Sequence, residues 1–359
     1  MDKNSKIFVA GHRGLVGSAI LKNLQSKGYT NFVLRTHAEL DLTDQVAVNE
    51  FFAAEKPEYV FLSAAHVGGI MANSLYRADF IYINLMIQNN VIYASWKNNV
   101  KKLLFLGSTC IYPCEAPQPM PEDCLLTSPL EYTNEPYAIA KIAGIKMCES
   151  FNLQYGTNYI AVMPTNLYGP NDNFNLETSH VLPAIIRKMH LAKCLYDNDW
   201  DTLRKDLNTR PVESVSGKAA QEEIIAVLEK YGIRKNEVEL WGTGKPMREF
   251  LWSEEMADAS VYIMEHVDFE DVRQKEGDVR NTHINIGTGI EHSIREVAEF
   301  VKKEIDYKGK LRFNTSKPDG TLLKLTDVRK LHALGWRHTI ELEDGVGQLY
   351  KWYLDNLQD

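Results

Sequence analysis

Short apolar runs alternate with amphipathic stretches along the first half of the chain. Ile7–Ala10, Tyr59–His66 and Leu103–Gly107 are nearly continuous in apolar residues, as strands buried on both faces of a parallel sheet are. Between them, Ser18–Lys27 and Asp79–Asn98 carry apolar residues at helical spacing. Strands and helices that alternate with short turns predict an α/β fold with a doubly wound parallel sheet. Ligands of such sheets bind at the carboxyl ends of the strands.

A glycine-rich loop, Gly11-His12-Arg13-Gly14-Leu15-Val16-Gly17, joins the first strand to the first helix. A strand, a glycine turn and a helix in this order open a Rossmann dinucleotide-binding domain. The glycines permit a tight turn and close approach of the backbone to a pyrophosphate, and the helix N-terminus offers N–H groups to it. The spacing is G-x-x-G-x-x-G rather than the commoner G-x-G-x-x-G, and the alternative is a plain turn between strand and helix.

The second predicted strand, Asn31–Arg35, ends on a cation where NAD sites place an acidic residue. Guanidinium groups pair bidentately with phosphate, so Arg13 and Arg35 together predict NADPH/NADP, held through its 2′-phosphate. Alternatively, Arg35 is a solvated charge and the cofactor is NAD. Further along, Asp41 is placed to reach an adenine.

A Tyr-x-x-x-Lys pair follows a proline that is expected to start a helix. This puts Tyr137 and Lys141 one turn apart on one helix face, beginning near Pro136. An ammonium near a phenol favours the phenolate, so Lys141 is expected to lower the pKa of Tyr137 from its reference value of ~10. Such a tyrosine can protonate a developing alkoxide near neutral pH. The pair also arises by chance on surface helices, so the assignment needs a hydride source and a carbonyl site.

The segment after the Leu103–Gly107 strand supplies that carbonyl site. Ser108 and Cys110 are two residues apart in a segment predicted to be extended, so their side chains should point the same way. Ser108, Tyr137 and Lys141 then form a reducing triad. Ser108 would donate to the substrate carbonyl, Tyr137 would protonate it, and Lys141 would hold the nicotinamide ribose. The alternative is that Ser108 only caps a turn.

Composition restricts the possible partners and the compartment. A net charge of −8 and a pI of about 5.8 argue against a general nucleic-acid binder. The five cysteines show no C-x-x-C spacing, which favours free thiols in a reducing compartment and predicts no metal site. No apolar run approaches the ~20 residues of a membrane span, and the first residues lead directly into a strand. We expect a cytoplasmic protein without membrane contact.

Six separated sequence blocks carry a family resemblance: Ala10–Gly14, Lys102–Ser108, Asn134–Gly144, Met163–Pro170, Pro246–Leu251 and Ser316–Thr321. Together they resemble the extended short-chain dehydrogenase/reductases, and more narrowly the GDP-L-fucose synthase family. The resemblance implies conversion of GDP-4-dehydro-6-deoxy-D-mannose to GDP-L-fucose. The reaction would combine epimerisation at C3 and C5 with NADPH-dependent reduction at C4, and the enzyme would be a homodimer.

The resemblance also implies residue roles. Cys110 and His180 would be the base and acid of the epimerisations. Without it, Cys110 would be interpreted as an inert buried thiol and His180 as a loop histidine. The remaining cofactor contacts implied are Leu42, Ala64, Ala65, Leu106, Gly107, Pro164, Thr165, Asn166, Leu167 and His180.

Four residues are implied to surround the GDP-sugar: Lys188, Trp241, Arg248 and Asp319. The cations suit a diphosphate, and Trp241 offers an aromatic wall. Each also has a structural alternative. Lys188 could be a surface charge, Trp241 a core residue, Arg248 the partner of Glu249 in an ion pair, and Asp319 a turn residue.

These assignments predict an NADP-binding domain over residues 1–170, to which later segments return, and a substrate domain over 171–359. Departures from the family pattern are His37, where a second arginine is often found, and a long segment at about 196–238. In that segment, 197–211 is interpreted as a loop and 218–231 as an amphipathic helix.

Two competing functions remain. A nucleotide-sugar dehydratase would place an acid pair after the Thr, where this chain has Thr109-Cys110. A regulatory protein that binds NADP without turnover would not need Ser108, Cys110, Tyr137, Lys141 and His180 together.

Overall fold

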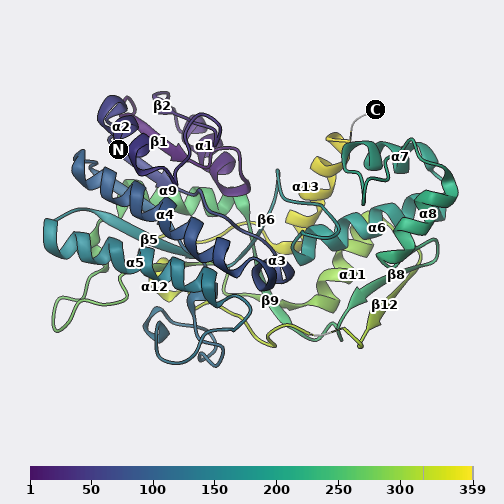
Figure 1. Cartoon of the computed structure of the whole chain (residues 1–359). Coiled ribbons are helices and arrows are strands. Elements are labelled where there is room, and N and C mark those ends of the chain that lie inside the picture. The colour runs from purple at the N-terminus through teal and green to yellow at the C-terminus, as the bar shows by residue number, and fades with distance from the viewer. Residues whose placement is uncertain (318, 358–359) are drawn as a thin grey trace. The chain divides into compact units, whose positions relative to one another are not determined.

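The computed structural model describes residues 1–317 and 319–357 as two compact units (Figure 1). Unit 1 contains residues 1–167, 249–289 and 325–339, and unit 2 contains residues 168–248, 290–324 and 340–359. The chain passes between the units five times, twice within short strands, β6 (Asn166–Tyr168) and β9 (Met247–Trp252).

Unit 1 is built on a six-stranded sheet in the order β10-β5-β4-β3-β1-β2. Every neighbouring pair in it is parallel. Its strands are β1 (Ile7–Ala10), β2 (Phe32–Val33), β3 (Tyr59–Leu62), β4 (Lys102–Leu106), β5 (Tyr159–Pro164) and β10 (Ile284–Ile286). The predicted doubly wound parallel sheet is confirmed.

Two helical layers cover this sheet. The helices of unit 1 are α1 (Leu15–Ser26), α2 (Gln45–Glu55), α3 (Ile70–Leu75), α4 (Arg77–Lys97), α5 (Glu135–Tyr155), α9 (Ser253–His266), α10 (Phe269–Val272) and α12 (Arg329–Ala333). Alternate strand residues face opposite layers, because side chains of a strand have a period of two. Val60 packs in the core with α2, α4 and α5, whereas Phe61 packs in the core with α1 and α9. Figure 1 shows α4 and α5 side by side.

The strand order reverses beside β1. The chain leaves β1 toward β2 on one side and returns to β3 on the other. The loops that follow β1 and β3 therefore lie next to each other at the carboxyl edge of the sheet. This reversal is where doubly wound sheets bind their ligands.

Unit 2 combines helices with a three-stranded sheet in the order β12-β8-β7. Its strands are β7 (Ile233–Arg234), β8 (Glu237–Trp241), β11 (Glu291–Ser293) and β12 (Lys310–Asn314). Its helices are α6 (Val181–Asp197), α7 (Trp200–Thr209), α8 (Gln221–Lys230), α11 (Ile294–Ile305) and α13 (Leu342–Asp355).

The prediction of a loop over 197–211 is wrong, because α7 occupies most of it. Asp199 caps the helix by accepting from the N–H of Thr202. The carboxylate of Asp206, fully buried, accepts from Arg187 Nε and Nη2 at 3.0 and 2.8 Å, and from the Tyr353 hydroxyl. The loop was expected because the charged residues of this segment were taken to be solvated. Asp206 is instead buried, paired with the buried Arg187.

The other predicted helices end within a few residues of the observed bounds. The expected helix at 218–231 is α8, and that at 79–98 is α4. Within residues 1–317 and 319–357, no helix combines the length and apolar character needed to cross a bilayer.

Candidate active site

The glycine loop of unit 1 makes a tight turn between β1 and α1. Gly11 has a φ of +83°, and a Cβ there would lie 2.9 Å from the backbone nitrogen of Ala64. A Cβ on Gly17 would lie 2.1 Å from the carbonyl oxygen of Gly11. Glycine at these two positions therefore lets the first turn of α1 and the end of β3 close on the loop.

The middle glycine of the loop, Gly14, has a different role. A Cβ on Gly14 would meet only the Gly11 carbonyl oxygen, at an ordinary 3.5 Å. Gly14 is also the N-cap of α1 and makes no side-chain cap. The first N–H groups of α1 thus lack a side-chain acceptor, as in sites where a helix N-terminus binds phosphate. This geometry fits the pyrophosphate of a dinucleotide.

The two candidate arginines for the 2′-phosphate have different surroundings. Arg13 is exposed in the glycine loop. Arg35 donates to Glu55 Oε1 at 2.6 Å and to the Leu34 carbonyl at 2.9 Å. A phosphate at Arg35 would therefore share its guanidinium with Glu55. Arg13 is the less engaged of the two cations.

Other predicted cofactor residues lie in this loop and in the segment that precedes α2. The Nδ1 atom of His12 is buried and has no hydrogen-bond partner among the described residues, and burial and the charge of Arg13 lower the pKa of the imidazole. Asp41 accepts from the N–H and hydroxyl of Thr43, both at 2.8 Å, which lowers its carboxyl pKa. The carbonyls of Leu42 and Thr43 accept from the buried Asn90 amide. The loop that carries Asp41 and Leu42 is therefore held in a defined conformation.

Helix α5 carries the Tyr137–Lys141 pair. The helix begins at Glu135 with Pro136 in its first turn, as predicted. Lys141 is buried, and its Nζ donates to the carbonyl of Leu106 at 2.8 Å and lies 5.7 Å from the centre of the Tyr137 ring. Burial lowers the pKa of Lys141 to about 8.

The expected lowering of the Tyr137 pKa is not observed. Burial raises the pKa of Tyr137 well above its ordinary value, and the neighbouring Cys110 adds to the rise. Desolvation of the phenolate outweighs the ammonium of Lys141, whose charge is directed at the Leu106 carbonyl. Tyr137 is thus a protonated phenol at neutral pH.

Ser108 and Cys110 lie at the end of β4. The prediction of an extended segment fails after Ser108, because Thr109–Ile111 forms one turn of 3₁₀ helix. The hydroxyl oxygen of Ser108 accepts from the Cys110 N–H at 3.3 Å, so the serine caps this turn. Its O–H can still donate to a substrate, because capping uses only a lone pair. Cys110 is buried at 9% exposure.

Two supporting residues were missed by the sequence interpretation. Gln88, on α4, is buried and donates from Nε2 to the carbonyl of Ala140 at 2.6 Å, between Tyr137 and Lys141 along α5. Phe80 packs edge-on against Tyr137, with ring centres 6.3 Å apart. The sequence signal for Gln88 was its position as a polar residue among the apolar positions of the predicted helix 79–98.

The carboxyl ends of β4 and β5 supply the remaining cofactor-side candidates of unit 1. Gly107 follows Leu106, and a Cβ there would lie 2.3 Å from the Met163 thioether. After Pro164, the last residue of β5, Asn166 donates to the carbonyl of Glu249 at 2.8 Å. The remaining candidates are Ala64 and Ala65, which follow β3, together with Thr165 and Leu167.

Unit 2 holds the predicted substrate residues. Lys188, on α6, is buried, donates to the Glu239 carbonyl at 3.1 Å and has its pKa lowered by burial to about 8. Trp241 ends β8 with 57% of its surface exposed, so it is not a core residue. The ammonium of Lys317 lies 5.2 Å from the centre of its ring.

Arg248 and Asp319 are joined through one loop. Arg248 Nη1 donates to the carbonyl of Thr321 at 2.6 Å. Asp319 accepts from the N–H and hydroxyl of Thr243 at 2.8 and 2.7 Å, and these bonds lower its pKa. The alternative of an Arg248–Glu249 ion pair is wrong, because the Glu249 carboxylate bonds instead to Thr288, Gly289 and Thr326. Pro318 of this motif lies outside the described residues.

His180 is the N-cap of α6 in unit 2. The residue is exposed, but desolvation of its ring by neighbouring protein atoms and the charge of Lys324 lower the pKa of the imidazole. The lowered pKa favours the neutral imidazole near pH 7, so His180 must take up a proton before it can act as an acid.

Comparisons with known proteins agree with this arrangement. The chain matches the NAD dependent epimerase/dehydratase family over residues 7–211 and 212–287. It is 51% identical to GDP-L-fucose synthase 1 of Arabidopsis thaliana, covering 99% of this chain and 95% of the relative. It is 48% identical to GDP-L-fucose synthase of Escherichia coli K12, covering 98% and 97%.

A solved structure is also similar: a GDP-D-glycero-L-gluco-heptose synthase from Campylobacter jejuni, determined in the presence of NADPH. It has a TM-score of 0.88, 48% identity and 99% coverage of both chains. The expected resemblance is confirmed. The chain belongs to the NAD-dependent epimerase/dehydratase family, within the extended short-chain dehydrogenase/reductases that include the GDP-L-fucose synthases.

Proposed function

We propose that this protein converts GDP-4-dehydro-6-deoxy-D-mannose to GDP-L-fucose, by epimerisation at C3 and C5 and NADPH-dependent reduction at C4. The observation that carries the proposal is the grouping of Ser108, Cys110, Tyr137 and Lys141 at the carboxyl edge of the parallel sheet. Sequence identity of about half to two GDP-L-fucose synthases, over nearly the whole chain, supports the sugar.

NADPH supplies the hydride that reduces C4 of the bound sugar. In this chain, its pyrophosphate would be held by the N–H groups at the start of α1, and its 2′-phosphate by Arg13 with Arg35. The open space beside Gly14 supports a pyrophosphate at the start of α1. Lys141 would hold the nicotinamide ribose.

Epimerisation needs a base and an acid on carbons that flank a ketone. Protons at C3 and C5 are acidic when the enolate oxygen at C4 is stabilised. The hydroxyls of Ser108 and Tyr137 can donate to that oxygen. Cys110, as a thiolate, would be the base that removes the proton, and His180, as an imidazolium, would be the acid that returns one. The inverted carbon then carries a proton from the enzyme or solvent.

Reduction needs a proton at the C4 oxygen as the hydride arrives. Tyr137 is suited to donate it, because burial raises its pKa and keeps the phenol protonated. The buried Lys141, tied to the Leu106 carbonyl, fixes the charge near the phenol. Ser108 would orient the carbonyl during both reactions.

The GDP diphosphate would lie on the cations of unit 2. Lys188 and Arg248 are both partly desolvated, which strengthens their attraction for phosphate oxygens. The exposed face of Trp241 would cover an apolar or aromatic part of the ligand, and Asp319 would fix the loop that holds Arg248.

A GDP-4-keto-heptose is the second candidate substrate. It is favoured by the similar Campylobacter jejuni heptose synthase, which matches this chain as fully as the fucose synthases do. Both substrates present a C4 ketone to the same catalytic residues. They differ in the carbon chain beyond C5.

Purified protein, NADPH and each of the two 4-keto sugars test the proposal. We expect nicotinamide absorbance to fall with GDP-4-dehydro-6-deoxy-D-mannose, and GDP-L-fucose to form. Faster turnover by at least tenfold in kcat/KM with the heptose would support the second candidate. Absence of turnover with both would refute the proposed reaction.

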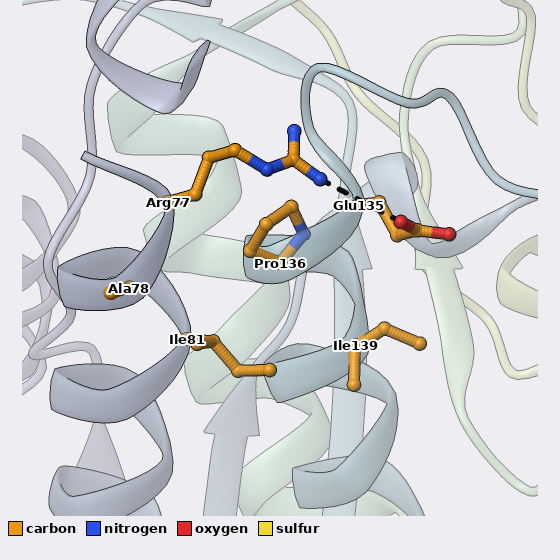
Figure 2. A pocket seen from close by; sticks show the side chains of 6 residues that line it. All are labelled: Arg77, Ala78, Ile81, Glu135, Pro136 and Ile139. Carbon is orange, nitrogen blue, oxygen red and sulfur yellow. Dashed lines mark ion pairs between the residues drawn. The ribbon is translucent and has the colours of Figure 1, made fainter. Parts of the chain in front are cut away.

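We infer further that the enzyme is a homodimer formed through the outer faces of α4 and α5. A groove between these helices is lined by Arg77, Ala78, Ile81, Glu135, Pro136 and Ile139, and Figure 2 shows Arg77 and Glu135 across it, with an ion pair of 3.7 Å. The exposed residues Tyr82 and Tyr93, three turns apart, extend the apolar surface along α4. A second copy can cover such a stripe with its own, because a two-fold interface is self-complementary.

Sedimentation measurements test the dimer. Ile139→Glu should shift the protein to monomer, whereas Ile225→Glu, a similarly exposed residue of α8, should not. A monomeric wild-type protein at micromolar concentration would refute the dimer. The five cysteines form no disulfide, which supports a reducing, cytoplasmic location.

A further inference from the structure

Glu249 is a fully buried carboxylate that lies at the junction of three distant segments of unit 1. Its Oε1 accepts from the N–H groups of Thr288 and Gly289 at 2.6 and 2.8 Å. Its Oε2 accepts from the N–H and hydroxyl of Thr326 at 3.0 and 2.6 Å. These donors are neutral, so the buried charge is compensated by hydrogen bonds.

The surroundings are shaped to receive this carboxylate. Thr288 and Gly289 follow β10, and their successive N–H groups converge on one oxygen, as backbone groups do in anion-binding turns. A Cβ on Gly287 would lie 2.1 Å from Glu249 Oε1 and 2.5 Å from the Thr326 hydroxyl oxygen. Only glycine leaves room for the carboxylate at that point.

The backbone of the same residue reaches the cofactor side. The carbonyl oxygen of Glu249 accepts from Asn166 Nδ2 at 2.8 Å and from the Thr165 hydroxyl at 3.3 Å. Thr165 is also tied by its N–H to the Ile286 carbonyl at 3.0 Å. The side chain of Glu249 thus fixes the carbonyl that orients Asn166.

We propose that Glu249 is a positioning residue for the cofactor, acting through Asn166. This inference rests on the proposed cofactor role of Asn166. In strand β9, Arg248 and Glu249 are successive residues, whose side chains leave on opposite sides. Strand β9 therefore carries Arg248, a proposed phosphate ligand, and next to it Glu249, whose carbonyl accepts from the side-chain amide of Asn166.

The test compares NADPH binding, by fluorescence titration, with the melting temperature. Glu249→Gln removes the charge and turns an NH₂ group toward N–H donors. The main-chain carbonyl of residue 249 should then no longer be held in place as the acceptor for Asn166. We expect NADPH affinity to fall by about tenfold, the equivalent of one hydrogen bond. Glu255→Gln is the matched control, because Glu255 is also a buried acid bonded to a Thr, Thr339. It should lower the melting temperature but leave NADPH affinity within about twofold.

A double-mutant cycle separates positioning from general destabilisation. Asn166→Ala should weaken NADPH binding, and adding Glu249→Gln should then cause little further loss, because both changes remove the same contribution. Fully additive losses, or unchanged NADPH affinity in Glu249→Gln, would overturn the inference. Unchanged affinity in Asn166→Ala alone would instead refute the proposed cofactor role of Asn166.

Thr326→Val gives a milder variant if Glu249→Gln does not fold. It removes the hydroxyl donor and keeps the N–H of residue 326. NADPH affinity should fall by about threefold in this variant. A lowered melting temperature with unchanged affinity would overturn the inference here as well.

Discussion

The ammonium of Lys141 donates to the main-chain carbonyl of Leu106 across 2.8 Å, which ties helix α5 to the last residue of β4. Ser108 lies two residues beyond this carbonyl, and Tyr137 lies one helical turn before the lysine. The bond therefore fixes the distance between the serine hydroxyl and the phenol. Gln88 adds a second tie, from α4 to the Ala140 carbonyl.

Tyr137→Phe should block reduction while leaving NADPH bound. The variant keeps the ring, and hence its packing against Phe80, but removes the proton that the C4 oxygen must receive. Loss of a positioned general acid lowers kcat by about 10²–10⁴-fold. Stopped-flow absorbance of the nicotinamide measures the effect, and normal turnover would remove Tyr137 from this role.

Cys110→Ser should impair proton exchange at C3 and C5 more than it affects the cofactor. A serine hydroxyl is a much weaker base than a thiolate at neutral pH. Deuterium incorporation from D₂O into the sugar, followed by NMR, should fall by about tenfold or more, with NADPH affinity unchanged. Equal exchange in the variant and the wild type would show that another group is the base.

Two neighbouring glycines should respond differently to alanine. Gly17→Ala places a Cβ 2.1 Å from the Gly11 carbonyl oxygen and should lower the melting temperature. Gly14→Ala meets only an ordinary contact at 3.5 Å, so its stability should be near wild type. Its new methyl group would narrow the space beside the start of α1, so NADPH affinity should fall. Unaltered NADPH affinity in Gly14→Ala would argue against a pyrophosphate there.

The buried Lys141 gives a pH-dependent term in stability. Its pKa is lowered from 10.5 to about 8 by burial, so the folded state disfavours the ammonium. Below pH 8 both the folded and the unfolded state hold the proton, so the cost of burying the ammonium lowers the free energy of unfolding in full. As the pH rises from there toward the unfolded pKa, the folded state has lost the proton and the unfolded state still holds it, so this cost disappears. Relative to Lys141→Met, the wild type should gain up to about 3 kcal/mol between these limits.

Urea unfolding of the ligand-free proteins at pH 7.5 and 9.5 measures this difference. Using the difference between the two proteins removes the opposite contributions of the buried tyrosines and cysteines, whose raised pKa values they share. A wild-type advantage that stays constant or shrinks with rising pH would contradict a lowered lysine pKa.

The sequence predicted the fold well because its signals are local. Continuous apolar strands and capped helices are properties of neighbouring residues, and the parallel sheet with its glycine loop follows from them. The start of α5 next to Pro136 was likewise predictable from the sequence. Helix α7 was missed because the burial of Asp206 depends on Arg187, nineteen residues earlier.

The site was harder to predict because burial decides its electrostatics. Spacing placed Lys141 beside Tyr137, but desolvation, which spacing does not reveal, raises the tyrosine pKa rather than lowering it. The anchor at Glu249 likewise depends on contacts between distant segments. The residue types of the site were therefore predictable from the sequence. Their charge states and hydrogen-bond partners required the structure.

The most direct test of the proposed reaction is one incubation in D₂O with NADPH and GDP-4-dehydro-6-deoxy-D-mannose, analysed by NMR. We expect GDP-L-fucose with deuterium at C3 and C5 and with the hydride of NADPH at C4. A product reduced at C4 that retains its original configuration and protons at C3 and C5 would contradict the proposed reaction, because Cys110 and His180 would then play no part.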